Sequence, residues 1–424
     1  MRKNYILLIF LTVCFSMILT GCDSSKDSQK KQVVFLNNLM SISDKLDEYE
    51  KRFEKLHPDI DIKIESIGDQ YENISVTRLN AGKAGDVMII PSYMSVAYYP
   101  DYYESLYSVD EALEKYRFSD IRSVNGQVYS IPLAMNISGG ILCDMKILND
   151  AGIEKAPESL EELKDALKAV KSKTDAVPLY SDARGESELT CWNSLDYTLS
   201  HNPDYNEDMI SKDDLFSKEN GYYDVYKFLY VCVNENLIED AFTNSKWNDG
   251  IKYIKEGKLA CAVVSLDMYE DAKKEAMNKE SLIYIPLKSS DGQFYFYGEP
   301  SYGIGINKDS TNKEEAKMWL EYLLDDTDFL DYAGDSSILV KNSEKNYEEC
   351  MNGKDIKIIY PHAMEEGKIG VFEKIDNEAC LGIYGGSFAF NLINDVSQNN
   401  RDYDEMCSEW NSKWNSARKE ISKN

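Results

Sequence analysis

The stretch VVFLNN, residues 33–38, begins an alternation of strands and helices that decides the fold of this chain. Its first four residues form a short, continuous apolar run, which is typical of a strand covered on both faces. Two further strand patterns follow at residues 60–64 (IDIKI) and 86–90 (DVMII), each after a segment long enough for a helix. Strands and helices in this order predict a parallel sheet with right-handed connections.

The first connecting segment carries the signals of an amphipathic helix. Ser41-x-x-Asp44 predicts a cap at its start, and Pro58 predicts its end. Four apolar residues recur at helical spacing and predict one buried face: Leu46, Tyr49, Phe53 and Leu56.

A second α/β unit begins near residue 131. Ser159-x-x-Glu162 predicts a capped helix within it, and Thr311-x-x-Glu314 predicts another further along the chain. The turn signal SSDG at residues 289–292 lies between YIPL and FYFY and predicts a β-hairpin. Two such units in a chain of 424 residues, without a long linker, predict two domains joined by several crossings.

The N-terminus has the pattern of an export signal. Arg2 and Lys3 precede an uncharged apolar run at residues 5–19, which is too short for a comfortable membrane span. The ending LTGC at residues 19–22 resembles a bacterial lipobox, in which Cys22 carries the lipid. We therefore expect a lipoprotein signal peptide at residues 1–21 and a lipid anchor with a flexible stalk at 22–32. An ordinary signal peptide with a chance cysteine is the alternative.

Composition excludes several functions. The net charge of −27 opposes nucleic-acid binding, because phosphate contacts depend on Lys and Arg. The three histidines lack metal-ligand spacing, so no metal site is expected. Neither a G-x-S-x-G motif nor a complete phosphate-binding loop is present, and we expect no cofactor and no catalytic residue. The cysteines contain no C-x-x-C pair, which argues against a disulfide framework.

Several phrases of the sequence resemble one family, in that family's order. The chain is similar to extracellular solute-binding proteins of family 1, the maltose-binding-protein-like lipoproteins that serve carbohydrate ABC transporters. It departs from the family at Cys143-Asp144, where Tyr-Asn is usual, and at Leu160, where Trp is common. The matching phrases are FEKLHPDI (53–60), GDVM (85–88), NGQVYSIP (125–132), DAGI (150–153), EGKLA (256–260) and GIGIN (303–307).

The resemblance implies a two-lobed α/β fold of the periplasmic-binding-protein type II. Two doubly wound sheets would be joined by a hinge of three crossings, near residues 131–137, 276–282 and 332–340. The first lobe would comprise residues 33–134 and 281–333, and the second lobe residues 135–280 and 334–424. Ligand would be held between the lobes as they close.

The candidate ligand contacts follow from the chemistry of a sugar. Its hydroxyls need amides or carboxylates, and its C–H faces suit Tyr and Trp, which tolerate burial with their polar end bonded. Ligands of open α/β sheets bind beyond the carboxyl ends of strands, where Asn38, Gln70 and Tyr93 are found. Turn formation by Asn37 and Asn38 is the alternative.

Further candidates come from resemblance to the family. Asn136 follows the first crossing, and Trp192 is expected in a loop that carries a stacking aromatic residue. Asp267 follows a strand but could cap a helix, and Trp247 could pack against one. The complete set of expected ligand contacts is Asn38, Gln70, Tyr93, Asn136, Trp192, Trp247, Asp267, Glu299, Tyr302 and Tyr384.

Together these features predict a binding protein that captures a sugar or oligosaccharide for an ABC importer. Its partners would be the saccharide, the permease subunits and, through the N-terminal lipid, the membrane. We expect a monomer on the extracytoplasmic face of the cell membrane. Two alternatives stay open, namely the same fold binding a polyamine or peptide, and a surface glycoside hydrolase, which needs only two suitably spaced carboxylates.

Overall fold

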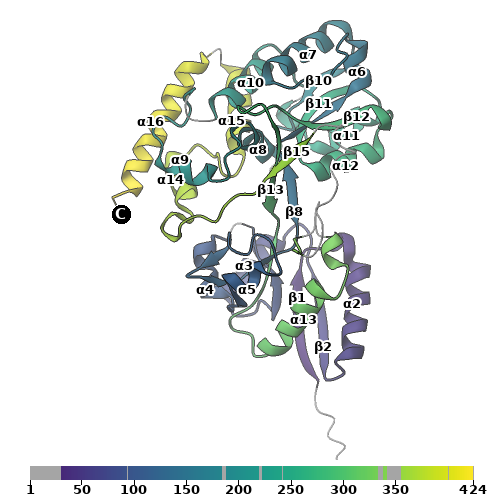
Figure 1. The fold of residues 1–424 in the computed structure, drawn as a ribbon, viewed down its shortest axis with the longest axis vertical. Coiled ribbons are helices and arrows are strands. Elements are labelled where there is room, and N and C mark those ends of the chain that lie inside the picture. The colour runs from purple at the N-terminus through teal and green to yellow at the C-terminus, as the bar shows by residue number, and fades with distance from the viewer. Residues whose placement is uncertain are drawn as a thin grey trace, which may run out of the picture.

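The molecule consists of two lobes stacked along its longest axis (Figure 1). The N-terminal strands build one lobe, and strands β8 and β13 lead from it into the other, which carries the C-terminal helix. The computed structural model describes residues 30–92, 94–183, 188–218, 222–240, 242–332, 338–340, 355–399 and 401–423. The expected signal peptide and Cys22 lie outside these residues.

The first lobe is built on a five-stranded sheet of order β2-β1-β3-β14-β7. β1 pairs in parallel with β2 and β3, which confirms the predicted strand–helix alternation. β14 then adds antiparallel to β3 and to β7. β1 begins at residue 31, so the expected stalk is two residues too long. The strands are β1 (Lys31–Asn37), β2 (Ile60–Ser66), β3 (Val87–Ile89), β7 (Ile131–Pro132) and β14 (Gly303–Ile306).

Helices α2 and α13 pack together against this sheet. The Phe53 ring of α2 meets the Trp319 ring of α13 at 5.2 Å between centroids. Leu46, Tyr49 and Phe53 are buried as predicted, but Leu56 is exposed at the helix end. The helices of this lobe are α2 (Ser43–Leu56), α3 (Tyr71–Asn80), α4 (Tyr99–Tyr102), α5 (Val109–Leu113) and α13 (Lys313–Asp325), beside a small sheet of β4 (Tyr107–Ser108), β6 (Gln127–Val128) and β5 (Ser123–Val124).

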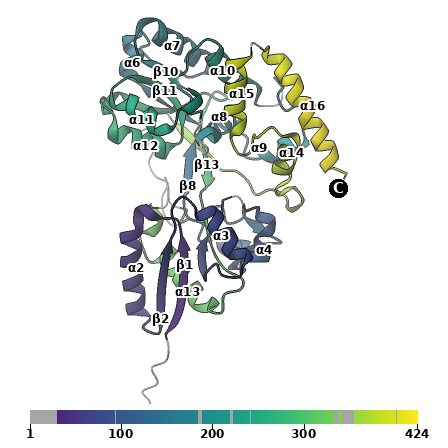
Figure 2. The ribbon, with the colours of Figure 1, turned by 180° about the vertical axis from the view of Figure 1, so that it is seen from behind.

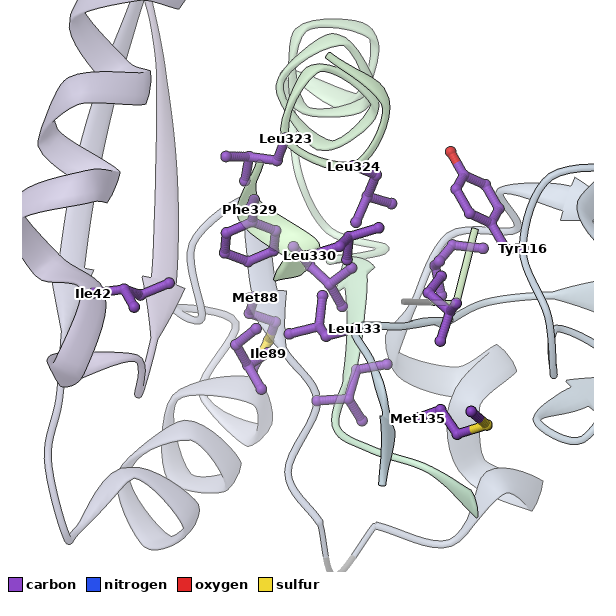
Figure 3. Close-up of a cluster of buried hydrophobic side chains, with 14 of the residues drawn as sticks. Ile42, Met88, Ile89, Tyr116, Leu133, Met135, Leu323, Leu324, Phe329 and Leu330 are labelled. Carbon is purple, nitrogen blue, oxygen red and sulfur yellow. The ribbon is translucent and has the colours of Figure 1, made fainter. Parts of the chain in front are cut away.

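The end of α13 closes the core of the first lobe (Figure 3). Leu323 and Leu324 of α13, with Phe329 and Leu330 of the following turn, gather on one side of it. Side chains of β3 and of the segment after β7 approach them, and all are nearly inaccessible to solvent. The facing residues are Met88, Ile89 and Leu133.

Only one of the three predicted helix caps forms. Ser159 accepts a hydrogen bond from the backbone N–H of Glu162 and caps α7, as predicted. The chain enters α2 through a short 3-10 turn, Met40–Ile42, so Ser41 lies within a turn and caps nothing. α13 starts after Asn312 without a side-chain cap, so the prediction for Thr311 is also wrong.

Three strands connect the lobes: β8 (Met135–Ser138), β13 (Phe294–Pro300) and β15 (Ile356–Ile359). They form a small sheet in which β13 lies between the other two. β13 pairs antiparallel with β8 and parallel with β15. This sheet lies where the chain passes between the lobes, and its strands are called the hinge strands here after the predicted hinge.

The second lobe is built on a four-stranded sheet of order β10-β11-β9-β12. β9 (Gly140–Asp144) runs antiparallel to β11 (Leu259–Val264) and to the edge strand β12 (Leu282–Pro286). At the other edge, β10 (Val177–Tyr180) pairs in parallel with β11. The C-terminal helix lies on the outside of this lobe (Figure 2). The helices are α6 (Met145–Asp150), α7 (Leu160–Lys173), α8 (Cys191–Ser200), α9 (Tyr205–Ser211), α10 (Tyr223–Asn234), α11 (Trp247–Lys255), α12 (Leu266–Glu275), α14 (Val371–Ala379), α15 (Ser387–Gln398) and α16 (Tyr403–Ile421).

The structure moves two of the expected crossings to later residues. β12 pairs with β9, so residues 282–286 belong to the second lobe, and the chain returns through β13. Residues 338–340 still bind the first lobe, because Arg117 donates its backbone N–H to Ile338 at 2.8 Å. Boundaries at 281 and 334 are therefore too early, because strand pairing between distant segments leaves no local sequence pattern.

The expected hairpin is a tight turn whose arms separate. Within the turn, Ser289 donates its backbone N–H to the carbonyl of Gln293 at 2.9 Å, and Lys288 forms one bridge with Phe294. Beyond this bridge β12 continues in the sheet of the second lobe, whereas β13 joins the hinge. The turn signal was correct, but the pairing of the two strands was not.

Candidate functional site

Two expected site residues face each other across the hinge strands. Asn136 of β8 and Glu299 of β13 are direct partners in the antiparallel register. Directly opposed side chains lie about 4.5–5.5 Å apart at Cβ and share a face of the sheet. An amide and a carboxylate are thus held side by side where the lobes join.

Arg122 is the cation of this site, and the sequence analysis did not select it. Its Nη2 donates a hydrogen bond to the carbonyl of Pro300 at 3.0 Å, directly after Glu299. Gly303 leaves room for this arrangement, because a Cβ there would lie 3.2 Å from Arg122 Nη1 and 1.9 Å from Ser130 Oγ. The guanidinium is therefore fixed against the hinge by backbone contacts.

Burial raises the pKa of Glu299, and the charge of Arg122 partly opposes this shift. Within the described part of the chain, no hydrogen bond to the Glu299 carboxylate is recorded. A hydrogen bond to a poorly hydrated carboxylate is stronger than a hydrogen bond to a carboxylate in bulk water. Glu299 is consequently the strongest acceptor that the hinge offers to a ligand.

Tyr384 adds a ring from the second lobe. Its loop is fixed by Asp376, whose Oδ2 accepts the backbone N–H of Tyr384 at 2.9 Å. The side chain is 58% exposed, yet burial of the hydroxyl raises its pKa, with Glu373 adding to the shift and Arg122 opposing it. The ring of Tyr384 is therefore accessible to solvent, while its hydroxyl lies within the electrostatic influence of Glu373, Arg122 and Glu299.

Four residues form a group that we call the hinge cluster: Arg122, Asn136, Glu299 and Tyr384. They come from both lobes and from the strands between them. The charge of Arg122 acts on Glu299 and Tyr384 and also on Tyr99 of α4. Tyr302 lies between β13 and β14 and is 45% exposed, and its carbonyl accepts the N–H of Leu133 at 2.8 Å. The arrangement offers an acceptor, a donor, an amide and exposed rings, which are the groups that a polyhydroxylated ligand needs.

The carboxyl end of β1 carries a second polar group. Asn37 Oδ1 accepts from the N–H of Leu39 at 3.0 Å and from Ser66 Oγ at 3.1 Å, which supports the turn-forming alternative for this residue. Asn37 Nδ2 and Asn38 Oδ1 are buried and have no partner among the described residues. Buried polar atoms without partners are rare, and these two can still take up a ligand or water.

The structure gives less support to the two other ligand contacts expected in the first lobe, Gln70 and Tyr93. Gln70 is exposed at the N-cap position of α3, where its side chain makes no capping hydrogen bond. Tyr93 lies outside the described residues. Tyr98, which the sequence analysis did not select, is 57% exposed next to Tyr99.

Trp192 is a core residue. It belongs to α8 and not to a loop as expected, and only 1% of its surface is accessible. Its ring packs 6.2 Å from that of Phe228. A side chain buried to this degree cannot stack on a ligand without rearrangement of the core.

Trp247 and Asp267 lie apart from the hinge cluster in their contacts. Trp247 begins α11 and packs against Tyr180 at 6.2 Å between ring centroids, as the packing alternative expected. Asp267 is exposed in the first turn of α12, where Ser265 Oγ donates to its carboxylate. Ser265 and not Asp267 is the N-cap residue.

The second lobe also contains a polar cavity of about 430 Å³, which shares no lining residue with the hinge cluster. Glu239 lies buried in its wall and accepts hydrogen bonds from Ser181 Oγ at 2.8 Å and Ser245 Oγ at 2.6 Å. Burial raises the pKa of Glu239, and these hydrogen bonds oppose the shift. The cavity is lined by Tyr180, Glu239, Asn244, Ser245, Asp249, Lys252, Tyr253 and Glu256.

Two other kinds of feature are absent from the described ranges. No three His, Cys, Asp or Glu side chains come together there as a metal site. No helix of those ranges is long and apolar enough to cross a membrane.

The geometry of two lobes and a polar hinge agrees with comparison to known proteins. Residues 41–328 match the family model of bacterial extracellular solute-binding proteins. The chain belongs to this family. Its members are solute-binding proteins and not enzymes, so the resemblance noted in the sequence is confirmed and the glycosidase alternative is not supported.

Individual relatives bind oligosaccharides. The melibiose/raffinose/stachyose-binding protein MelE of Bacillus subtilis is 25% identical over 342 residues, which cover 76% of this chain and 77% of MelE. A binding protein of an ABC transporter from Bifidobacterium animalis, solved with mannobiose, has a TM-score of 0.79 at 25% identity and covers 92% of this chain and 95% of its own. A manno-oligosaccharide-specific protein of the same species, solved with mannotriose, has a TM-score of 0.78 at 25% identity, with 93% and 96% covered.

Proposed function

We propose that this member of the solute-binding family captures a short, neutral oligosaccharide between its lobes and delivers it to an ABC importer. The observation that best supports this proposal is the hinge cluster, in which groups of both lobes lie around Glu299. Relatives that bind mannobiose, mannotriose or melibiose and raffinose support this ligand class over a polyamine or a peptide.

Each member of the hinge cluster has a role in this proposal. The Glu299 carboxylate accepts sugar hydroxyls in charge-assisted hydrogen bonds, and the Asn136 amide beside it both donates and accepts. Arg122 donates to ring or hydroxyl oxygens, and Tyr384 and Tyr302 cover C–H faces of the sugar. Because Arg122 already offsets the charge of Glu299, the site suits a neutral ligand.

We propose that the two lobes close around the ligand, because the groups of the hinge cluster come from both lobes. A ligand that bonds Arg122 of the first lobe and Tyr384 of the second makes both sets of contacts only when the lobes are together. Such a ligand shifts the population toward the closed form by its differential affinity for that form. Asn38 and Gln70 of the first lobe, and Trp247 and Asp267 of the second, are proposed as outer contacts for a longer ligand.

We also propose that the mature chain is tethered to the outer face of the cell membrane by lipid on Cys22 and acts there as a monomer beside the permease. The lipobox-like sequence LTGC supports this tether. The strand β1 begins only nine residues after Cys22, which leaves a short stalk. In an expressing bacterium, the wild type should incorporate labelled palmitate and Cys22→Ser should not. Absence of the label from the wild type would contradict the lipid tether.

Thermal unfolding with a panel of ligands tests the proposed binding. Mannobiose, mannotriose, melibiose and raffinose are compared with spermidine and a tripeptide, each at millimolar concentration. A ligand at about 100 times its Kd stabilises the native state by about 2.7 kcal/mol, which raises the Tm by several degrees. A response to spermidine or peptide alone, or to none of the sugars, would overturn the proposal.

A further inference from the structure

Two cysteines of the second lobe lie in contact on neighbouring strands. Cys143 of β9 and Cys261 of β11 are direct partners in the antiparallel register. Their sulfur atoms are 3.6 Å apart, and both residues are completely buried. Among the described cysteines, this is the pair whose sulfurs meet; Cys191, Cys232 and Cys407 are buried at other positions, and Cys380 is exposed.

We propose that Cys143 and Cys261 are an oxidation site, which forms an intramolecular disulfide when the exported chain folds in the presence of an organic disulfide. Opposed residues of antiparallel strands have Cα atoms about 4.5–5.5 Å apart, inside the range of about 4.4–6.8 Å that a disulfide needs. The sulfurs must approach by only about 1.5 Å to reach bonding distance, which side-chain rotation can supply without moving the strands.

The oxidant is an organic disulfide such as oxidised glutathione. The thiolate of one cysteine attacks a sulfur of this disulfide, forms a mixed disulfide and releases one glutathione thiolate. The thiolate of the second cysteine then attacks the protein sulfur of the mixed disulfide and releases the second glutathione. Two protein thiols are oxidised, one organic disulfide is reduced to two thiols, and the two protons pass to the released thiolates.

The reaction belongs to folding and not to the finished native state. The contact with Cys143, together with burial, raises the pKa of Cys261 well above its usual range, so the native thiol stays protonated and unreactive. Neither sulfur is open to a bulky oxidant once the sheet is covered. Exchange therefore occurs while β9 and β11 are paired but helices α6 and α7 have not yet closed over them.

The consequence is a covalent connection between two strands of the second lobe. Cys143 and Cys261 pack in the same core as residues of α6 and α7, whereas the hinge cluster lies at β8 and β13. The loop that the bond closes spans more than 100 residues, and long loops lose the most conformational entropy in the unfolded state. We expect a more stable lobe with unchanged ligand binding, independent of which ligand the protein takes.

Peptide mapping of the full-length protein tests the proposal. Protein extracted from membranes of an expressing host is unfolded, reduced, and refolded with or without oxidised glutathione; free thiols are then alkylated. We expect a cross-linked peptide pair containing Cys143 and Cys261, lighter by two hydrogen atoms, in the oxidised sample alone. The Tm of that sample should rise by about 5 °C or more over the reduced sample.

Variants assign the rise in Tm to this bond. Cys143→Ser and Cys261→Ser should each abolish the cross-link and the difference in Tm, and the control Cys232→Ser should keep both. Alkylation of both cysteines in refolded, oxidised wild-type protein, or a bond from Cys261 to Cys232, would overturn the proposal. The wild-type map decides this even where a serine variant fails to fold, and sugar-induced shifts are scored separately.

Discussion

The hinge cluster and the aromatic core around α8 each contain a carboxylate whose pKa is raised by burial, but the hydrogen-bond donors around the two carboxylates differ. In the α8 core, Asp196 accepts hydrogen bonds from the hydroxyl of Tyr205 and from the backbone N–H of Tyr222 at 3.0 Å. Tyr226 likewise donates to Asn193 Oδ1 at 2.6 Å. Folding has supplied partners for these groups. At the hinge, Glu299 receives only the through-space influence of Arg122 among the residues described.

The difference separates a structural carboxylate from one available to a ligand. Burial raises the pKa of both groups, so the direction of the shift alone would not distinguish them. The distinction lies in the donors around each carboxylate: two from the protein for Asp196, and none recorded from the described residues for Glu299. Substitutions in the α8 core should therefore change stability, whereas those at the hinge should change affinity.

The largest effect is expected for Trp192→Ala in the α8 core. Removal of a fully buried indole leaves a cavity, and such changes lower the free energy of unfolding by about 3–5 kcal/mol. Urea unfolding followed by circular dichroism measures this loss. The sugar affinity of the folded fraction should stay within about twofold of wild type. Trp192→Phe, which retains most of the ring, is the matched control and should lose less than half as much stability. A selective loss of affinity in either variant would instead return Trp192 to the binding site.

Glu299→Gln should have the next largest effect, and this effect should be on sugar affinity and not on stability. The amide preserves size but removes the negative acceptor, and hydrogen bonds to a charged group contribute about 1.5–3 kcal/mol each. Calorimetry with the sugar that raises the Tm should show affinity lower by about 10- to 100-fold.

The stability of Glu299→Gln should be equal to or above that of wild type, because burial already disfavours the charged form of Glu299. Glu161→Gln is the control, since that exposed carboxylate pairs with Lys164 on the surface of α7. If Glu299→Gln binds sugar as tightly as this control does, Glu299 is not a ligand contact.

The contrast also explains what the sequence could predict. The first three strands and the first helix of the first lobe have clear apolar patterns, so their positions and the parallel pairing of β1 with β2 and β3 were predicted. The antiparallel addition of β14 and β7 was not. α8 has no such period, because polar and apolar residues alike are buried along CWNSLDYTLS. Trp192 was therefore expected in a loop, although it lies in a helix that the core surrounds on nearly every side.

Site residues were likewise predicted where the local sequence marks them and missed where their role depends on distant contacts. Asn136 follows the first crossing and Glu299 lies between the turn signal SSDG and the strand pattern GIGIN, and the structure pairs the two residues across the hinge strands. Arg122 was missed because its importance depends on contacts with residues about 180 positions later, at Pro300 and Gly303. The one local signal was Gly303, a small residue at the point where the guanidinium and Ser130 approach the strand.

A smaller effect, in pH dependence, is expected for Asp196→Asn. Burial raises the pKa of Asp196 to about 6 from its ordinary value of 3.8. Between these values the native state holds a proton that the unfolded state has lost, so wild-type stability falls as pH rises through this window. Asn carries no titrating proton but can still accept from Tyr205 and Tyr222.

The stability of Asp196→Asn relative to wild type should therefore increase by about 2 kcal/mol between pH 4 and pH 7. Urea unfolding at several pH values measures the difference. Asp404→Asn is the control, because this exposed carboxylate accepts from Tyr223 at the surface of the lobe. Parallel stability curves for wild type and Asp196→Asn would contradict a raised pKa at this position.

The smallest effect expected is that of Tyr384→Phe, which tests how the second lobe takes part in binding. The substitution removes a hydroxyl that lies within the influence of Glu299 and Arg122, but it keeps the exposed ring. A neutral hydrogen bond contributes about 0.5–1.5 kcal/mol, so affinity should fall about 3- to 10-fold without a change in Tm of the free protein. Tyr384→Ala removes the ring as well and should lose more affinity than Tyr384→Phe.

Tyr230→Phe is the control, because its hydroxyl donates a hydrogen bond to the carbonyl of Arg401 in another part of the second lobe. Equal affinities for Tyr384→Phe, Tyr384→Ala and this control would place the ligand against the first lobe and the hinge strands alone, and the second lobe would then close without touching it at Tyr384.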